Sequence, residues 1–191
     1  MATLTKAMLD DLHKGCASIS LLAYPKGGVV LAGLSFKDAD QVFTEQDTFN
    51  MAPDDPSTEA FKIDQYDETI DFDFENGDWV ITGNIPSWAT AVFDYFYEAG
   101  EDVSGDGKTI EGQAGTKYEG KGYNEPKEVE VSVLVESKSK KTAIALAHVK
   151  IVVNNPAIDD HKKPGYVKFT GYVLANAKAG ASKFAILKAA A

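Results

Sequence analysis

The sequence predicts a mainly β protein, a sandwich or barrel of antiparallel strands flanked by one amphipathic helix and joined by long loops. Apolar and polar residues alternate in several short runs that are bounded by turn residues. Only one internal stretch spaces its apolar residues as a helix does. With 191 residues, 44% of them hydrophobic and 25% charged, the chain suits a single globular domain, 1–191.

Strand-like runs recur along the chain. Two of them lie within 17–36, on either side of the turn residues 25–28, and two more, 128–137 and 142–153, flank a lysine-rich turn. Further runs follow at 166–176 and 183–188. The stretch 3–14 has apolar residues at helical spacing, although a loose N-terminal arm fits it equally well.

The stretch "IDFDFENGDWVITG" (70–83) predicts a β-hairpin. Asn76-Gly77 is favoured in a two-residue type I′ turn, and that turn sets Phe74 opposite Trp79. Side chains alternate between the faces of a strand, so one face is apolar. The other face carries the acids Asp71, Asp73, Glu75 and Asp78. A solvated outer face is the simplest interpretation, but Glu75 opposite Asp78 would be destabilising.

The stretch "PSWATAVFDYFYEAG" predicts a helix over about residues 87–99. Pro86 and Ser87 are typical of a helix start, and Gly100 is typical of the position just after a helix end. Apolar side chains recur at three- and four-residue spacing, at Trp88, Ala91, Val92, Tyr95, Phe96 and Ala99. This aromatic stripe indicates that the helix packs on a sheet or inside a barrel.

Two long segments separate these elements. Residues 37–59 are polar, acidic and interrupted by prolines, which predicts a long loop or an extended hairpin. Residues 101–126 are rich in glycine and predict a long loop. Its part "DVSGDGKTIEGQ" has Asp102 where a phosphate loop needs glycine, and Gln113 where a calcium loop needs a bidentate glutamate. We therefore interpret it as a surface loop.

Charge is distributed unevenly along the chain. The net charge is −10, but residues 38–78 carry 14 acids and one lysine, whereas residues 138–188 carry ten lysines and two acids. Opposite segments of this kind either neutralise each other within one fold or dock copies head to tail. All 19 basic residues are lysines, and the absence of arginine makes specific nucleic-acid binding a poor interpretation.

No pattern in the sequence favours catalysis or a cofactor. His13, His148 and His161 have no metal-ligand spacing, and the single Cys16 completes no zinc site. We expect His148 to be a packed or interface histidine. The sequence predicts no metal, no cofactor and no enzyme activity. It also shows no membrane span or signal-peptide pattern, and one cysteine suits a reducing compartment.

The order of these features resembles the tail tube (major tail) proteins of tailed bacteriophages, a family related in fold to the tubes of contractile injection systems. The closing run "VKFTGYVLANAKAGASKFAILK" carries the resemblance most clearly, with a strand that ends in Leu174-Ala175-Asn176 and a short terminal strand after it. The resemblance extends over roughly residues 17–188. It lies in the order and general character of the segments and not in a sharp motif.

This resemblance implies a function as well as a fold. Such subunits form hexameric rings whose inner strands join around a channel, and the rings stack into the tail tube of the virion. The implied partners are other copies of the chain, tail terminator and baseplate proteins, and the tape-measure protein and DNA that pass through the lumen. Assembly would take place in the host bacterial cytoplasm, and no membrane is implied.

The resemblance also suggests roles for the charged residues. On the channel wall, the acids Asp71, Asp73, Glu75 and Asp78 would repel DNA phosphates and let the genome slide. Contacts between copies would join lysines to acids, with the candidates Lys138, Lys140, Lys141, Lys162, Lys163, Asp47, Asp54 and Asp55. Two alternatives stay open: another ring protein of the tail (a terminator or baseplate component), and a monomeric β-barrel or sandwich that binds a small ligand or glycan.

Overall fold

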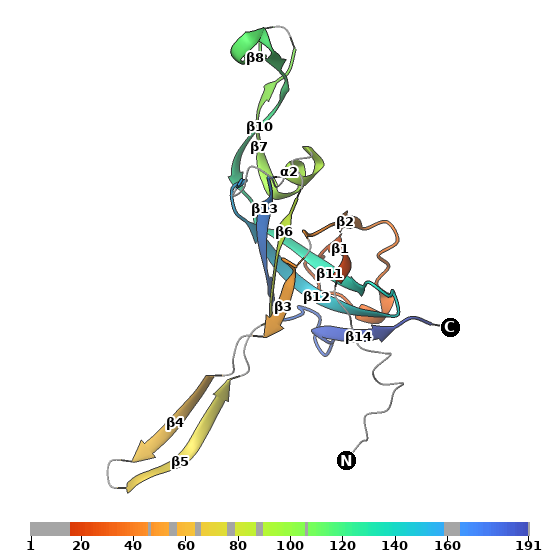
Figure 1. Ribbon diagram of the computed structural model, residues 1–191. Helices are drawn as coiled ribbons and strands as arrows, with labels where there is room; N and C mark the ends of the chain where they lie inside the picture. Colours follow the sequence, from red (N-terminus) through yellow and green to blue (C-terminus); the bar gives the residue numbers. More distant parts are fainter. Residues whose placement is uncertain are drawn as a thin grey trace.

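The structure is a computed structural model that describes residues 16–45, 47–53, 57–63, 66–75, 79–86, 90–105, 107–158 and 165–190 (Figure 1). For β4 and β5, only the backbone is described. The elements in chain order are β1 (Cys16–Ala23), η1 (Leu31–Gly33), β2 (Asp40–Val42), β3 (Asn50–Pro53), β4 (Ser57–Ile63), β5 (Tyr66–Glu75), β6 (Trp79–Ile85), α2 (Thr90–Phe96), β7 (Tyr97–Val103), β8 (Ile110–Glu111), η2 (Gln113–Gly115), β9 (Lys117–Tyr118), β10 (Gly120–Pro126), β11 (Val129–Ser137), β12 (Thr142–Val153), β13 (Val167–Val173) and β14 (Phe184–Lys188).

One antiparallel sheet of eight strands forms the body, in the order β2-β1-β11-β12-β13-β6-β3, with β14 also paired to β12. The long strand β12 shares one edge between two partners: residues 142–146 pair with β14 and residues 149–153 pair with β13. The sheet therefore divides along β12 and bends. The expected mainly β fold of antiparallel strands with one helix is confirmed.

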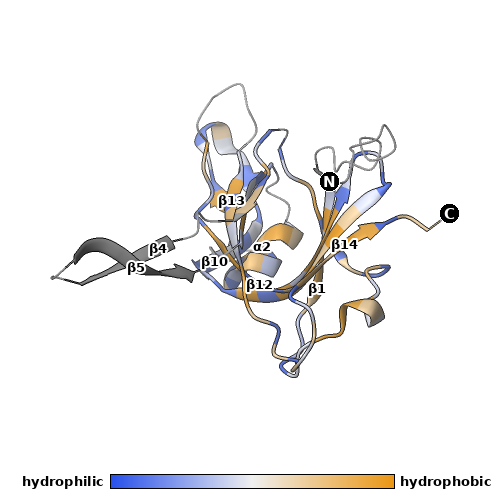
Figure 2. Cartoon of the chain, turned by 90° about the horizontal axis from the view of Figure 1, so that it is seen from below, coloured by the Kyte–Doolittle hydropathy of each residue, from blue (hydrophilic) through white to orange (hydrophobic). Residues whose placement is uncertain are grey.

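The core lies on the concave side of this sheet. It is built from alternate residues of β1, β11, β12, β13 and β6, whose side chains share one face because a strand alternates its side chains. The helix α2 closes the core with Val92, Phe93 and Tyr95, and Figure 2 shows it between the two arms of the bent sheet. No described helix is long and apolar enough to cross a membrane.

The prediction of a hairpin about Asn76-Gly77, between the strands now labelled β5 and β6, is wrong. Strand β5 pairs with β4, and β6 pairs with β13 on one edge and β3 on the other. Because both edges of β6 are occupied, no edge remains for β5, and Phe74 is not the partner of Trp79. Trp79 instead lies opposite Pro53, and Phe74 lies opposite Thr58. Burial of β6 within the sheet outweighs the local turn preference.

The prediction of a second strand within 17–36 is also wrong. The turn at Pro25 is present, with the Gly28 backbone N–H donating to the Pro25 carbonyl at 2.9 Å. The chain then passes through η1 instead of returning as a strand. The edge of β1 that such a strand would occupy is already paired with β2, which comes later in the sequence.

The helix ends earlier than expected, at Phe96 instead of about residue 99, and its described part runs over Thr90–Phe96. From Tyr97 the chain becomes β7, which pairs with β10, so Gly100 lies in a strand and caps no helix. The expected loop 101–126 is accordingly a long two-stranded ribbon, β7–β10, with β8, η2 and β9 near its tip (Figure 1). We call residues 97–126 the arm. The stretch 3–14 lies outside the described residues.

The acidic excursion 37–59 divides among three strands. Residues 40–42 form β2 at one end of the sheet, residues 50–53 form β3 at the other end, and residues 57–63 begin the separate β4–β5 hairpin. We call the β4–β5 hairpin (57–75) the acidic hairpin. Figure 1 shows the arm and the acidic hairpin leaving the body in different directions.

Candidate assembly surfaces

Three strands of the sheet, β2, β3 and β14, have an outer edge that pairs with none of the described strands, and large exposed apolar side chains lie on or beside two of them, β14 and β2. Along the strand order β2-β1-β11-β12-β14, each neighbouring pair is antiparallel. Among the described strands, none pairs with the outer edge of β2 or of β14. Strand β14 exposes large apolar side chains, with Ile186 73% exposed. Beside β2, Phe43 is 60% exposed. An open, apolar edge is a template for pairing with another strand.

A hollow of about 120 Å³ lies between the edge strand β2 and the helix α2. Its walls are Leu21, Asp40, Gln41, Val42, Ala91, Val92, Tyr95 and Phe96. Burial, together with the charge of Asp40, raises the pKa of the Tyr95 hydroxyl to about 12. The hollow is therefore mostly apolar, with one carboxylate and one neutral hydroxyl in its lining.

The lysines expected at a contact between copies lie on the turn that joins β11 and β12. Lys138, Lys140 and Lys141 are all exposed there, and Lys140 adopts a positive φ of 55°. This basic turn lies beside the end of β14, because the Ala189 backbone N–H donates to the Lys141 carbonyl at 2.8 Å. Asp47 is exposed as well, with a φ of 64°. The structure describes no contact between Asp47 and the basic turn.

Of the other predicted site residues, three are described by their backbone position alone and five lie outside the described residues. Asp71, Asp73 and Glu75 lie in β5, where Asp73 is the register partner of Glu59 on β4. Asp78, which the expected turn set opposite Glu75 on the same face of the hairpin, lies outside the described residues. Also outside them are Asp54, Asp55, Lys162 and Lys163.

The arm ends in an exposed apolar pair. Ile110 of β8 and Tyr118 of β9 are register partners and are 62% and 59% exposed. Gly112 lies close to the Tyr118 ring, because a Cβ on it would come within 2.8 Å of that ring. Large apolar side chains at the tip of a projecting ribbon are typical of a contact surface.

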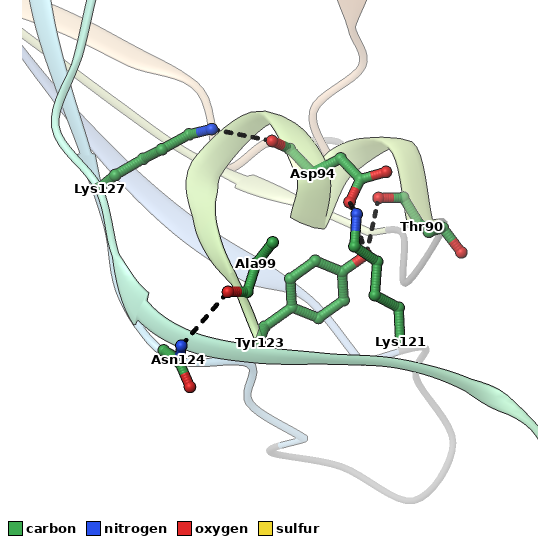
Figure 3. A network of polar contacts seen from close by, with 7 residues as sticks. All are labelled: Thr90, Asp94, Ala99, Lys121, Tyr123, Asn124 and Lys127. Atoms are coloured by element: carbon green, nitrogen blue, oxygen red, sulfur yellow. Dashed lines mark hydrogen bonds and ion pairs between the residues drawn. The ribbon is translucent and has the colours of Figure 1, made fainter. Parts of the chain in front are cut away.

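A network of polar side chains holds the foot of the arm against α2 (Figure 3). Asp94 accepts from the Lys121 ammonium at 2.6 Å and from the Tyr123 hydroxyl at 3.1 Å. The Lys127 ammonium donates to the Asp94 carbonyl at 2.9 Å. The hydrogen bond from Lys121 is the main cause that lowers the pKa of the Asp94 carboxyl, and the same contact raises the pKa of Lys121. The network is exposed and fixes where the arm begins.

A second network, which no local sequence pattern indicated, joins the end of β1, β12 and the closing run. The Tyr24 ring stacks on His148 of β12, and Tyr24 accepts from the Ala177 backbone N–H at 2.8 Å. Asn176 bridges the Val29 backbone, accepting from its N–H at 3.2 Å and donating to its carbonyl at 2.8 Å. An asparagine shortly after a strand was the available signal, but its partner Val29 is 147 residues away in sequence.

His148 is packed, as expected from its strand position. Its ring lies between Tyr24, the Ala175 carbonyl and Glu130. A carbonyl oxygen can only accept, so Nδ1 carries the hydrogen in its 3.0 Å contact with Ala175. The other nitrogen, Nε2, faces the Glu130 carboxylate at 3.4 Å. In the part of the chain that the structure describes, no three His, Cys, Asp or Glu side chains gather as metal ligands.

The fold and these surfaces define a mainly β protein with projecting hairpins and open sheet edges. No family model matches the chain, and no curated protein sequence matches it.

Proposed function

We propose that this chain is a structural subunit that assembles with copies of itself into stacked rings, as the tail tube proteins of bacteriophages do. The observation that carries the proposal is the pair of two-stranded ribbons that leave the body. Among the described elements, β4 and β5 make their extensive contacts only with each other, and most of the arm likewise contacts only itself. An isolated two-stranded hairpin is marginally stable in water, so neighbouring copies supply the missing cover.

The acidic hairpin suits a place on the channel wall. Asp71, Asp73 and Glu75 follow one another at every second residue of β5, and Glu59 lies opposite Asp73 in the register. Like charges in opposition are destabilising, and a ring would repeat them in every copy. A repulsive wall for DNA phosphates gives this arrangement a function: the genome passes without binding. At ~0.15 M salt, the repulsion acts over about 8 Å.

Electron microscopy of the purified chain at rising concentration, beside its mass from light scattering, tests the proposal. Rings or stacked tubes with a central hole are the expected result. Baseplate proteins of the same tail are added where the chain alone stays monomeric, because tube growth can require an initiator. A monomer that persists with the initiator present contradicts the proposal and favours a ligand-binding β protein.

A further inference from the structure

We propose that copies of this chain join through β14 of one copy and β2 of the next, so that the sheet continues from copy to copy. This inference rests on the proposed self-assembly and specifies the two strands that meet. It follows from three features of the described residues: an uncovered core-facing side chain at one edge, an unfilled hollow at the other edge, and opposite charge beside the two edges.

The uncovered side chain belongs to β14. Ile186 is the register partner of Ile144, and Phe184 is the register partner of Leu146, so both face the side of the sheet that holds the core. Leu146 is fully buried, yet Ile186 is 73% exposed. Phe184 is partly covered by Trp79, since the centroids of the two rings lie 4.6 Å apart. Ile186, two residues further along β14, faces the core side and stays largely exposed among the described residues.

The unfilled hollow belongs to β2. Val42 is the register partner of Ile19, and Asp40 is the register partner of Leu21, so both face the core side as well. There the helix α2 leaves the hollow of about 120 Å³ beside the strand. A strand added to the outer edge of β2 would place its core-facing side chains in this hollow. Ile186 of a second copy is an apolar side chain that faces the required side.

The strand directions and charges agree with this pairing. Four antiparallel pairings connect β2 to β14 through the sheet, so the two strands run in the same direction. In a ring of copies related by rotation, β14 of one copy would therefore pair with β2 of the next in parallel. Their carboxyl ends would then lie side by side. The basic turn at the end of β14 would then lie at the same end of the strand pair as the segment after β2, which carries Glu45 and Asp47 and is held on β6 through Asn84. Complementary charge of this kind selects the partner and its register.

The pairing of unlike edges decides the symmetry of the assembly. A two-fold dimer through β14 would be antiparallel, would place the two basic turns at opposite ends of the interface, and would leave the hollow beside β2 unfilled. Contacts between the unlike edges β14 and β2 instead close into rings or continue into filaments.

Chemical cross-linking between two single-cysteine variants tests the pairing. Gln41→Cys and Leu187→Cys are prepared in a Cys16→Ser background, since both positions are exposed and lie on the face away from the core. The variants are mixed and treated with a short bis-maleimide. We expect a covalent dimer from the mixture and little from either variant alone. Thr116→Cys, exposed near the tip of the arm, replaces Gln41→Cys in the control mixture.

A second variant tests the side chain in the hollow. We expect Ile186→Asp to raise the concentration at which half the protein assembles by about tenfold or more, because burying an isoleucine side chain stabilises by about 1.5–3 kcal/mol. Ile158→Asp is the matched control, since Ile158 is also an exposed isoleucine (61%) and follows the end of β12 opposite to the residues that pair with β14. Circular dichroism of each variant shows that the monomer still folds.

The outcomes separate this inference from the proposed function. Rings without a Gln41–Leu187 cross-link overturn the strand pairing and leave the proposed function standing. A cross-link without rings supports the pairing and counts against closed rings. A Leu187–Leu187 product would overturn the pairing in favour of a two-fold dimer, and absence of both rings and cross-links would overturn the two proposals together.

Discussion

The ring of Tyr24 lies flat on the ring of His148, with centroids 3.8 Å apart and planes within 2° of each other. Tyr24 follows the first described strand, and His148 lies in the middle of β12. The contact fixes the end of β1 against the strand from which β13 and β14 diverge. Through Asn176, the same network reaches the connection that leads into β14, so the position of this edge strand depends on it.

Asn176→Ala should destabilise the monomer by about 2 kcal/mol, because it leaves the Val29 backbone groups without their side-chain partner. Urea unfolding followed by circular dichroism measures the change. Asn124→Ala is the control: its side chain is exposed and makes one hydrogen bond, to Ala99 at 3.3 Å, and its loss should change stability by less than about 0.5 kcal/mol. Equal effects of the two variants would contradict a structural role for Asn176.

Gly171→Ala should destabilise the core by about 1–3 kcal/mol through overpacking. A Cβ at Gly171 would lie 2.6 Å from Cγ1 of Ile81 and 2.9 Å from Cγ1 of Val149, both of which are fully buried. Gly120→Ala is a matched control in a strand, since a Cβ there meets nothing within 4 Å. The midpoint of thermal unfolding should fall for Gly171→Ala and stay near the wild-type value for Gly120→Ala.

Ionisation of the Tyr95 hydroxyl should make the protein less stable in strong alkali. Burial raises the pKa of its hydroxyl from 10.0 to about 12, with the charge of Asp40 as the second cause. The unfolded chain then releases the proton at lower pH than the folded chain does. The contribution of this group is complete below pH 10 and is lost as the pH rises toward about 12. The phenolate absorbance of the wild type minus that of Tyr95→Phe measures the folded pKa, and a value near 10.0 would refute the prediction.

Asp94 should make the attachment of the arm sensitive to acid. Its pKa lies below the ordinary 3.8, mainly because Lys121 donates to it. A lowered pKa means that the contribution is present above the ordinary value and is lost as the pH falls through the folded value. We expect the protection factors of amides in β7 and β10, which correct for the intrinsic pH dependence of exchange, to fall at low pH in the wild type. In Asp94→Asn, they should already be lower at neutral pH and should change less with acid.

Reversing charge on the basic turn should weaken assembly. The double variant Lys140→Glu, Lys141→Glu should assemble at higher concentration than the wild type, and added Asp47→Lys should restore part of the loss. The wild type should also assemble less well at high salt, because exposed ion pairs are screened. Lys108→Glu with Lys117→Glu, two exposed lysines of the arm, is the matched control. Sedimentation of the four proteins in low salt and in 1 M NaCl provides the measurement, and unchanged assembly in 1 M NaCl would contradict the prediction.

The sequence predicted the parts of the fold whose signal is local. The strands β11 and β12 and the turn between them follow from alternation and from the lysine-rich break, and β14 follows from its short apolar run. The amphipathic helix was also predictable, although its end was not. Phe96 is the last helical residue because the following segment pairs with β10, a contact about 25 residues away.

Local patterns failed where two segments compete for one edge. Asn76-Gly77 favours a hairpin, yet β6 lies between β13 and β3, and its core-facing residues Ile81 and Ile85 are buried there. The candidate lysines could be named from their clustering in the sequence. The hollow beside α2 and the hydrogen bonds of Asn176 could not be predicted. Their residues come from distant segments, and only the folded chain brings them together.

The sequence by itself determined the fold class, the charge asymmetry and the faces of its longest strands, because periodicity and composition act over a few residues. The tertiary structure alone decided which strands pair, which edges stay open and where the hollow lies. Strand pairing depends on burial summed over the whole sheet, and a turn preference of two residues is small beside it.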